Sequence, residues 1–323
     1  MKFRNFGKTT ENISEIGHGT WGMGGMWGPR DDRQAIRSLC YSLEKGINFI
    51  DTAYDYGNGH SESLIASTFK ESKKTAFVAT KIQPKNLQWP ARAGISMQDV
   101  FPSEHIIEQT EMSLKNLRME CVDLQQLHVW QDAWLKDLNW LEAVQQLKEQ
   151  GKIRYFGISV NDHQPETALE AVKSGYIDSI QVIYNIFEQR PAEELFKLCL
   201  KHEVAVIVRV PFDEGALTGT LTPSTQFHKK DWRKHYFTEN RLEEVCRRVD
   251  KLKIIAERLK LSVSQLALKF CLSHAATTTV IPGMRHESHI DENCEASAKL
   301  LSDKVLEELK TLAWPKNFYP SHG

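Results

Sequence analysis

The stretch SEIGHGTWGMGGMWGPRDD, residues 14–32, is rich in glycine and decides how the chain begins to fold. It contains the spacing G-x-G-x-x-G from Gly17 onward, and Asp51 follows about thirty residues later, which is the fingerprint of a Rossmann fold. In that fold the glycines lead directly into a helix, whose N-terminus holds a pyrophosphate. Here further glycines and Pro29 follow, and they cost a helix roughly 1 kcal/mol per glycine and about 3 kcal/mol for the proline. A helix therefore cannot begin before about Asp31, and we predict a strand followed by a long glycine-rich loop.

Short runs of β-branched and apolar residues alternate with amphipathic helical patterns along the chain. This alternation predicts parallel strands joined by crossover helices. Eight fairly evenly spaced units favour a closed (β/α)8 barrel, the TIM barrel of the α/β class, over an open doubly wound sheet. The predicted strands are 15–19, 48–53, 76–82, 122–129, 155–160, 179–185, 204–210 and 277–283.

Residues 1–323 are expected to form a single barrel domain, because no segment reads as a linker. Residues 1–13 precede the first strand and are expected to form a hairpin that caps the bottom of the barrel. The repeat lengthens between the seventh and eighth strands, where residues 211–275 predict a long loop and extra helices. Residues 314–323 are expected to form a tail, because they carry no periodicity.

The composition is ordinary for a soluble globular protein, with 41% hydrophobic and 26% charged residues. A formal net charge of -1 gives no field that would attract nucleic acid. No run approaches the roughly 20 apolar residues of a membrane helix, and the start lacks the apolar core of a signal peptide. The six cysteines are scattered, which indicates reduced thiols and a cytoplasmic location. His286 and His289 have no third ligand in view, so we expect no bound metal.

Ionisable residues stand at the ends of three successive predicted strands. Asp51 ends the second strand, Lys81 the third and His128 the fourth, while Tyr56 follows Asp51 in a short loop. Each has an ordinary structural explanation, as a helix cap, a surface lysine, a core histidine or a loop aromatic. The carboxyl ends of barrel strands open on one face, however, so these four side chains are expected to converge there. Their recurrence at strand ends predicts a catalytic site.

The segments DTAYDYG, ATK and LQQLHVW resemble the aldo-keto reductase family, and the likeness covers nearly the whole chain. RVPFDEGALTG and IPGMR are most similar to the bacterial branch that contains general stress and inositol-catabolism proteins. The resemblance implies a TIM barrel that holds an extended nicotinamide cofactor. It also implies that Tyr56 is the general acid in carbonyl reduction. Lys81 and His128 would lower the pKa of Tyr56 towards 7, Asp51 would hold Lys81, and His128 would orient the carbonyl oxygen.

The same resemblance implies an NADPH site along the carboxyl-end face of the barrel. Arg209 stands where many members carry an aromatic residue that stacks on the nicotinamide ring. Arg285 is the expected ligand of the 2′-phosphate, with help from His289, at a place where some members have lysine and serine instead of Gly283 and Met284. The remaining cofactor residues implied are Gly19, Thr20, Trp21, Asp51, Ser159, Asn161, Gln181, Pro211, Leu217, Glu292 and Asn293.

Loop tryptophans on the catalytic face suggest an aromatic-walled pocket for a small carbonyl substrate, and Trp21, Trp27 and Trp130 are its predicted contacts. Trp89 and Trp134 lie in loops of the same face. Two other functions stay open at this stage: a nucleotide-sensing or regulatory subunit with little turnover, and an isomerase or lyase acting on a phosphorylated sugar. The sequence indicates no oligomeric state, and a monomer is compatible with it.

Overall fold

The computed structural model describes residues 1–317, and within them lies an eight-stranded parallel sheet. The strands are neighbours in chain order, and the sheet closes on itself because the Gly17 N–H donates to the Val280 carbonyl at 2.8 Å and the Gly19 N–H to that of Pro282 at 3.0 Å. The predicted TIM barrel is therefore confirmed. Its strands are β3 (His18–Gly19), β4 (Phe49–Asp51), β5 (Phe77–Ile82), β6 (Val122–Leu127), β7 (Ile153–Ser159), β8 (Ser179–Ile183), β9 (Ala205–Arg209) and β10 (Thr277–Val280).

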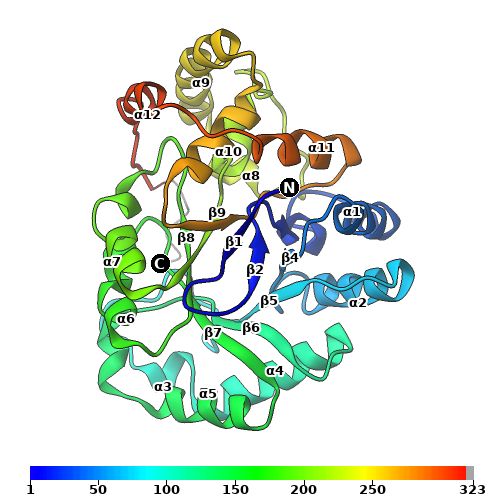
Figure 1. Ribbon diagram of the computed structural model, residues 1–323, viewed down its shortest axis with the longest axis vertical. Helices are drawn as coiled ribbons and strands as arrows, with labels where there is room; N and C mark the ends of the chain where they lie inside the picture. Colours follow the sequence, from blue (N-terminus) through cyan, green and yellow to red (C-terminus); the bar gives the residue numbers. More distant parts are fainter. Residues whose placement is uncertain (318–323) are drawn as a thin grey trace.

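Helices surround the barrel on the outside (Figure 1). The first, α1, begins at Asp32, and the Asp31 side chain caps it by accepting a hydrogen bond from the Gln34 N–H, so the expected start near Asp31 is confirmed. The α-helices are α1 (Asp32–Glu44), α2 (His60–Ser72), α3 (Met97–Val100), α4 (Ser103–Leu117), α5 (Asn139–Glu149), α6 (Leu169–Ser174), α7 (Leu195–His202), α8 (Arg233–Tyr236), α9 (Glu239–Leu259), α10 (Val263–Ser273), α11 (Glu287–Ala296) and α12 (Asp303–Lys310). Short 3-10 helices are η1 (Trp21–Gly24), η2 (Asp132–Lys136), η3 (Pro165–Ala168), η4 (Arg190–Ala192) and η5 (Asp213–Thr218).

A two-stranded hairpin covers one end of the barrel, at the centre of Figure 1. Its strands β1 (Phe3–Asn5) and β2 (Asn12–Ser14) pair in antiparallel fashion. Phe6, in the turn between them, is fully buried and packs on Phe49 and Phe77, with ring centroids 6.3 and 5.2 Å apart. Burial of such a ring stabilises the fold by about 1.5–3 kcal/mol. Because Phe49 and Phe77 begin their strands, the hairpin closes the end opposite the strands' carboxyl ends.

The long segment between β9 and β10 contains η5, α8, α9 and α10, and α9 and α10 lie together at the top of Figure 1. Buried charges tie this segment to the barrel rim. Asp213, just after β9, accepts hydrogen bonds from the Tyr236 hydroxyl at 2.6 Å and from the Arg241 guanidinium at 3.1 Å. The insertion therefore rests against the carboxyl-end face, where the candidate site is expected.

Part of the expected tail, residues 318–323, lies outside the described residues. The Trp314 ring packs against the Phe187 ring with centroids 5.8 Å apart, and the backbone N–H of Trp314 donates to the Phe187 carbonyl. In the described part of the chain, none of the helices is both long and apolar enough to cross a membrane. The same residues contain no cluster of metal-ligating side chains, and the six cysteines, all of them described, form no disulfide.

Candidate active site

The four ionisable residues predicted from the strand ends meet at the carboxyl end of the barrel. The Lys81 ammonium donates to Asp51 Oδ2 at 2.7 Å, to the Thr52 carbonyl at 2.8 Å and to the Tyr56 hydroxyl at 3.2 Å. Lys81 is completely buried, and Tyr56 is 8% exposed. The His128 ring lies edge-on to the Tyr56 ring, with centroids 6.1 Å apart. One buried ammonium thus bridges a carboxylate and a phenol.

Hydrogen bonds from two further residues fix Asp51 at this position, and a third residue supports one of them. The Gln181 side-chain amide donates to Asp51 Oδ1 at 2.7 Å. The Thr20 hydroxyl donates to the Asp51 carbonyl at 2.9 Å and accepts from the Ser61 hydroxyl at 2.7 Å. Thr20 is completely buried and does not line the cleft, although the resemblance implies a cofactor contact for it. Its side chain holds the end of β4 from behind instead.

Burial dominates the electrostatics of the site. Burial, reinforced by the charge of Asp51, raises the pKa of Tyr56 well above its usual value, although Arg209 acts in the opposite direction. The expected lowering of the Tyr56 pKa towards 7 is therefore wrong for this arrangement, because the phenolate would lie beside Asp51 in a site shielded from water. Burial and the nearby Lys81 and Arg209 hold the pKa of His128 well below its usual value. At neutral pH, Tyr56 is protonated and His128 is an uncharged imidazole.

A cleft of about 1370 Å³ extends from Tyr56 across the carboxyl-end face. This exceeds the roughly 300–1,000 Å³ typical of sites for small ligands, so the cleft has room for a dinucleotide and a substrate. Most residues implied for the cofactor line it. They are Gly19, Trp21, Asp51, Ser159, Asn161, Gln181, Arg209, Pro211, Gly283, Arg285, His289, Glu292 and Asn293.

Leu217 is the second implied cofactor residue that the structure places elsewhere. Its side chain is fully buried in the core, and its N–H donates to the Phe212 carbonyl. The backbone of the preceding residues is left-handed, with φ of 56° at Glu214 and 101° at Gly215. This kink turns Glu214, Gly215 and Thr218 towards the cleft and Leu217 away from it.

The polar residues of the cleft floor already have partners. Arg209 donates to Asp162 Oδ1 at 2.6 Å and to the Val160 carbonyl at 3.0 Å. The Asn161 side chain accepts from the backbone N–H of Trp130 at 3.5 Å and donates to the Gln164 side chain at 3.2 Å, so it also stabilises the loop in which it lies.

At the far end of the cleft, Arg285 donates to the Trp27 carbonyl at 2.9 Å. Burial, with the nearby charge of Arg233, lowers the pKa of Arg285 from its ordinary value. None of the ion pairs within residues 1–317 includes Arg285. This half-buried cation therefore suits an anionic ligand.

Tryptophans from two distant segments form the wall of the cleft. The Trp21 ring lies 5.9 Å from that of Trp27 and 5.3 Å from that of Trp232, measured between centroids. The backbone N–H of Trp232 donates to the Met26 carbonyl, and the Arg233 guanidinium lies 4.0 Å above the Trp27 ring. The glycine-rich loop and the β9–β10 insertion therefore meet over the cleft. Trp232 and Arg233 were missed as site residues, although the sequence DWR in a long insertion at this face could have indicated them.

Trp130 does not line the cleft, although it is a predicted substrate contact. It is completely buried, and its ring packs edge-on against Trp134 and Trp140, with centroids 5.8 and 5.4 Å apart. Trp134 is equally a core residue. Trp89 does line the cleft, and its ring meets that of His128 at 5.8 Å.

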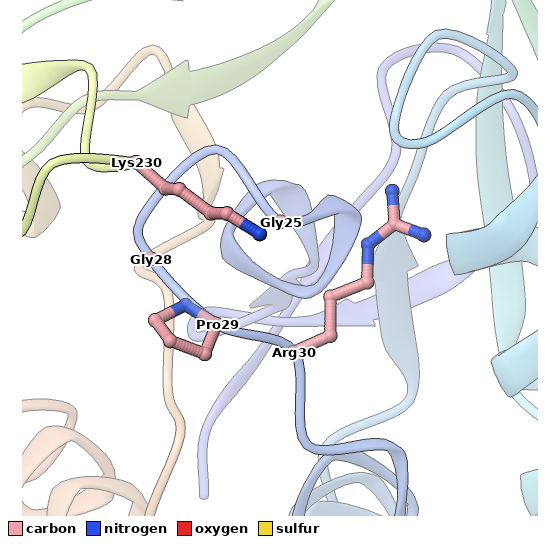
Figure 2. A pocket seen from close by; sticks show the side chains of 5 residues that line it. All are labelled: Gly25, Gly28, Pro29, Arg30 and Lys230. Carbon is pink, nitrogen blue, oxygen red and sulfur yellow. The ribbon is translucent and has the colours of Figure 1, made fainter.

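A second, smaller hollow of about 470 Å³ lies beside the glycine-rich loop (Figure 2). Its lining comes from the segment Gly25–Arg30 and from Lys230 of the insertion. The Arg30 guanidinium donates to the Gly24 carbonyl at 2.6 Å. None of the residues predicted to be catalytic lines this hollow, so the larger cleft is the candidate active site.

Comparison with known proteins agrees with this geometry. The pattern of the aldo/keto reductase family matches residues 15–313. The chain belongs to the aldo/keto reductase family. It is similar to an aldo-keto reductase [NADP(+)] of Schizosaccharomyces pombe, with 27% identity over 93% of this chain and 88% of the relative. It is 27% identical to an NADH-specific methylglyoxal reductase of Escherichia coli, over 94% and 95% of the two chains. The structure of a glycerol dehydrogenase from Gluconobacter oxydans superposes with a TM-score of 0.80, at 27% identity, over 100% of this chain and 99% of that one.

Proposed function

We propose that this reductase converts a small aldehyde, ketone or dicarbonyl to the alcohol with NADPH as reductant. The observation that carries the proposal is the Lys81 ammonium, which bridges the Asp51 carboxylate and the Tyr56 hydroxyl at the inner end of a dinucleotide-sized cleft. The relatives named for methylglyoxal and glycerol support a small substrate.

The residues of the cleft fit a bound nicotinamide dinucleotide. The Gln181 amide donates to Asp51, which leaves its oxygen to accept from a carboxamide, and Ser159 lies beside it on the neighbouring strand. The half-buried Arg285 supplies positive charge for a 2′-phosphate. It contacts the glycine-rich loop, which lies more than 250 residues away in sequence. A relative named for NADP(+) supports NADPH, whereas the relative named for NADH makes the preference the point to be measured.

A bound nicotinamide would supply the hydride, and the side chains of this chain donate the proton and stabilise the proton-transfer groups. The high pKa of Tyr56, caused by burial and Asp51, keeps the phenol protonated until a stronger base appears beside it. The alkoxide formed from the carbonyl is such a base, and Tyr56 protonates it. Lys81, 3.2 Å from the Tyr56 oxygen, stabilises the phenolate that remains. The uncharged His128 ring donates a hydrogen bond that orients the carbonyl oxygen towards Tyr56.

We propose a cytoplasmic location, since six cysteines without a disulfide suit a reducing compartment. The partners proposed are the dinucleotide and a small carbonyl compound. A nucleic-acid partner is not expected at a net charge of -1.

The test is consumption of NADPH and NADH by the purified chain against aldehydes, ketones and dicarbonyls, together with the variant Arg285→Ala. Loss of one charge-assisted contact should weaken NADPH binding by about 10- to 150-fold and leave NADH binding nearly unchanged. Arg258→Ala, which removes an exposed arginine of α9, is the matched control. No reduction of any carbonyl would overturn the proposed activity, and equal weakening of both cofactors would overturn the role of Arg285.

A further inference from the structure

Arg209 places a second cation in the reactive end of the cleft. It ends β9 beside β8, which carries Gln181, and its side chain is 18% exposed. Asp162 accepts a hydrogen bond from it at 2.6 Å. Its positive charge opposes the rise in the pKa of Tyr56 and helps to lower the pKa of His128, so its field reaches the reacting groups.

The position of the nicotinamide ring follows from the proposed function, on which this inference rests. Tyr56 gives a proton to the same carbonyl group that receives the hydride, so the ring must lie within a few ångströms of the Tyr56 hydroxyl. On the side of the cleft away from the glycine-rich loop, the floor is made by the ends of β7, β8 and β9. Ser159 and Arg209 end β7 and β9, Gln181 lies within β8, and all three line the cleft. The ring therefore rests near the Arg209 guanidinium.

We propose that Arg209 discriminates between the two redox states of the bound cofactor and that Asp162 moderates this discrimination. The oxidised nicotinamide ring carries one positive charge that the reduced ring lacks. A neighbouring guanidinium therefore weakens binding of the oxidised cofactor and leaves binding of the reduced cofactor nearly unaffected. The carboxylate of Asp162 cancels part of this repulsion.

The two charges have opposed effects on turnover. Repulsion by Arg209 speeds departure of the oxidised cofactor after reduction and limits inhibition by it. The same repulsion makes the reduced cofactor a poorer hydride donor, since donation creates the positive charge beside Arg209. The Asp162 carboxylate limits that cost. The pair thus sets a compromise between hydride transfer and release of the oxidised cofactor.

The experiment measures the dissociation constants of NADP+ and NADPH by equilibrium titration of the purified full chain. The quantity compared between variants is the dissociation constant of NADP+ divided by that of NADPH. Arg209→Gln should lower this ratio by about tenfold, as expected for one partly screened unit charge at short range. Arg209→Lys should largely preserve the ratio, because it keeps the charge. Asp162→Asn should raise it, because the arginine is no longer compensated.

Opposite shifts from the two neutralising variants cannot arise from a general loss of structure, which would move both in one direction. Asp55 and Glu214 also line the cleft but are unchanged throughout, so the shift in the ratio reports on Arg209 and Asp162. Glu308→Gln, which removes the carboxylate partner of Arg258 on the outer surface, is the control and should leave the ratio unchanged.

An unchanged ratio in Arg209→Gln, or equal shifts in Arg209→Gln and Arg209→Lys, would overturn the inference. The same titrations with NAD+ and NADH should show the same shifts, because the nicotinamide ring is the same. A wild-type chain that prefers NADH would refute the proposed NADPH preference but leave this test intact. A chain that binds no dinucleotide would overturn both proposals.

Discussion

Removal of the Tyr56 hydroxyl should separate catalysis from stability. In Tyr56→Phe, the Lys81 ammonium loses one acceptor at 3.2 Å but keeps Asp51 at 2.7 Å and the Thr52 carbonyl at 2.8 Å. The loss of one such hydrogen bond should lower the free energy of unfolding by about 1 kcal/mol. Loss of the proton donor should lower kcat by about 10²–10⁴-fold, the usual contribution of a general acid. The effect on the barrier is therefore several times the effect on the fold.

The assay is the loss of NADPH absorbance under saturating substrate, with cofactor binding measured separately by titration. Binding should stay nearly unchanged, since the hydroxyl acts mainly in the transition state. Tyr54→Phe, which removes the hydroxyl of a half-buried tyrosine two residues away, should behave like wild type. If Tyr56→Phe turns over within a few-fold of wild type, the proton comes from elsewhere and the assignment of the acid is refuted.

Three further substitutions test the charges of the structure. Lys81→Met should lower the free energy of unfolding by about 3–5 kcal/mol in urea titrations, because it leaves the Asp51 carboxylate buried without a cation, and a loss below about 1 kcal/mol would contradict this. Asp55→Asn should raise the ratio of kcat/KM for glyoxylate to kcat/KM for propionaldehyde by about tenfold, because it removes a cleft-lining carboxylate that repels anionic carbonyl compounds. An unchanged ratio of the two kcat/KM values would exclude that role for Asp55. Burial raises the pKa of Glu188, but hydrogen bonds from Arg190 and His163 outweigh burial and lower the pKa from 4.5 to about 2. The contribution of Glu188 to the free energy of unfolding is therefore complete above pH 4.5 and is lost as the pH falls towards 2. Glu188→Gln should flatten that acid limb of the stability curve, and an identical limb in wild type and variant would refute the assignment.

The barrel and the convergence of the candidate catalytic residues could be predicted because they depend on chain order alone. Parallel strands in sequence order bring Asp51, Lys81 and His128 to one rim, whatever the details of packing. The direction of a loop side chain depends on packing instead. Trp130 lies two residues beyond His128, but the strand ends at Leu127, so the alternation of faces no longer applies and the ring turns into the core.

The electrostatics of the acid could not be predicted from residue types. A lysine beside a tyrosine suggests a lowered tyrosine pKa, and the contact itself is present at 3.2 Å. Asp51 stands on the other side of the same ammonium, and burial removes the water that would stabilise a phenolate. The sign of the shift therefore depends on burial and on a third charge, and both are properties of the folded structure. The result suits reduction, in which the acid must hold its proton until the alkoxide forms.

Glycines of the stretch that imitates a Rossmann fingerprint are required here for packing. A Cβ atom at Gly19 would lie 2.6 Å from the Ile281 carbonyl oxygen, where the first strand closes the barrel against the last. A Cβ atom at Gly24 would lie 2.8 Å from the backbone of Tyr56, so only glycine lets the loop rest on the segment that carries the acid. The same loop brings Trp21 and Trp27 over the cleft, where they meet Trp232. The glycine-rich stretch therefore closes the barrel at Gly19, supports Tyr56 at Gly24 and forms one wall of the site with its tryptophans.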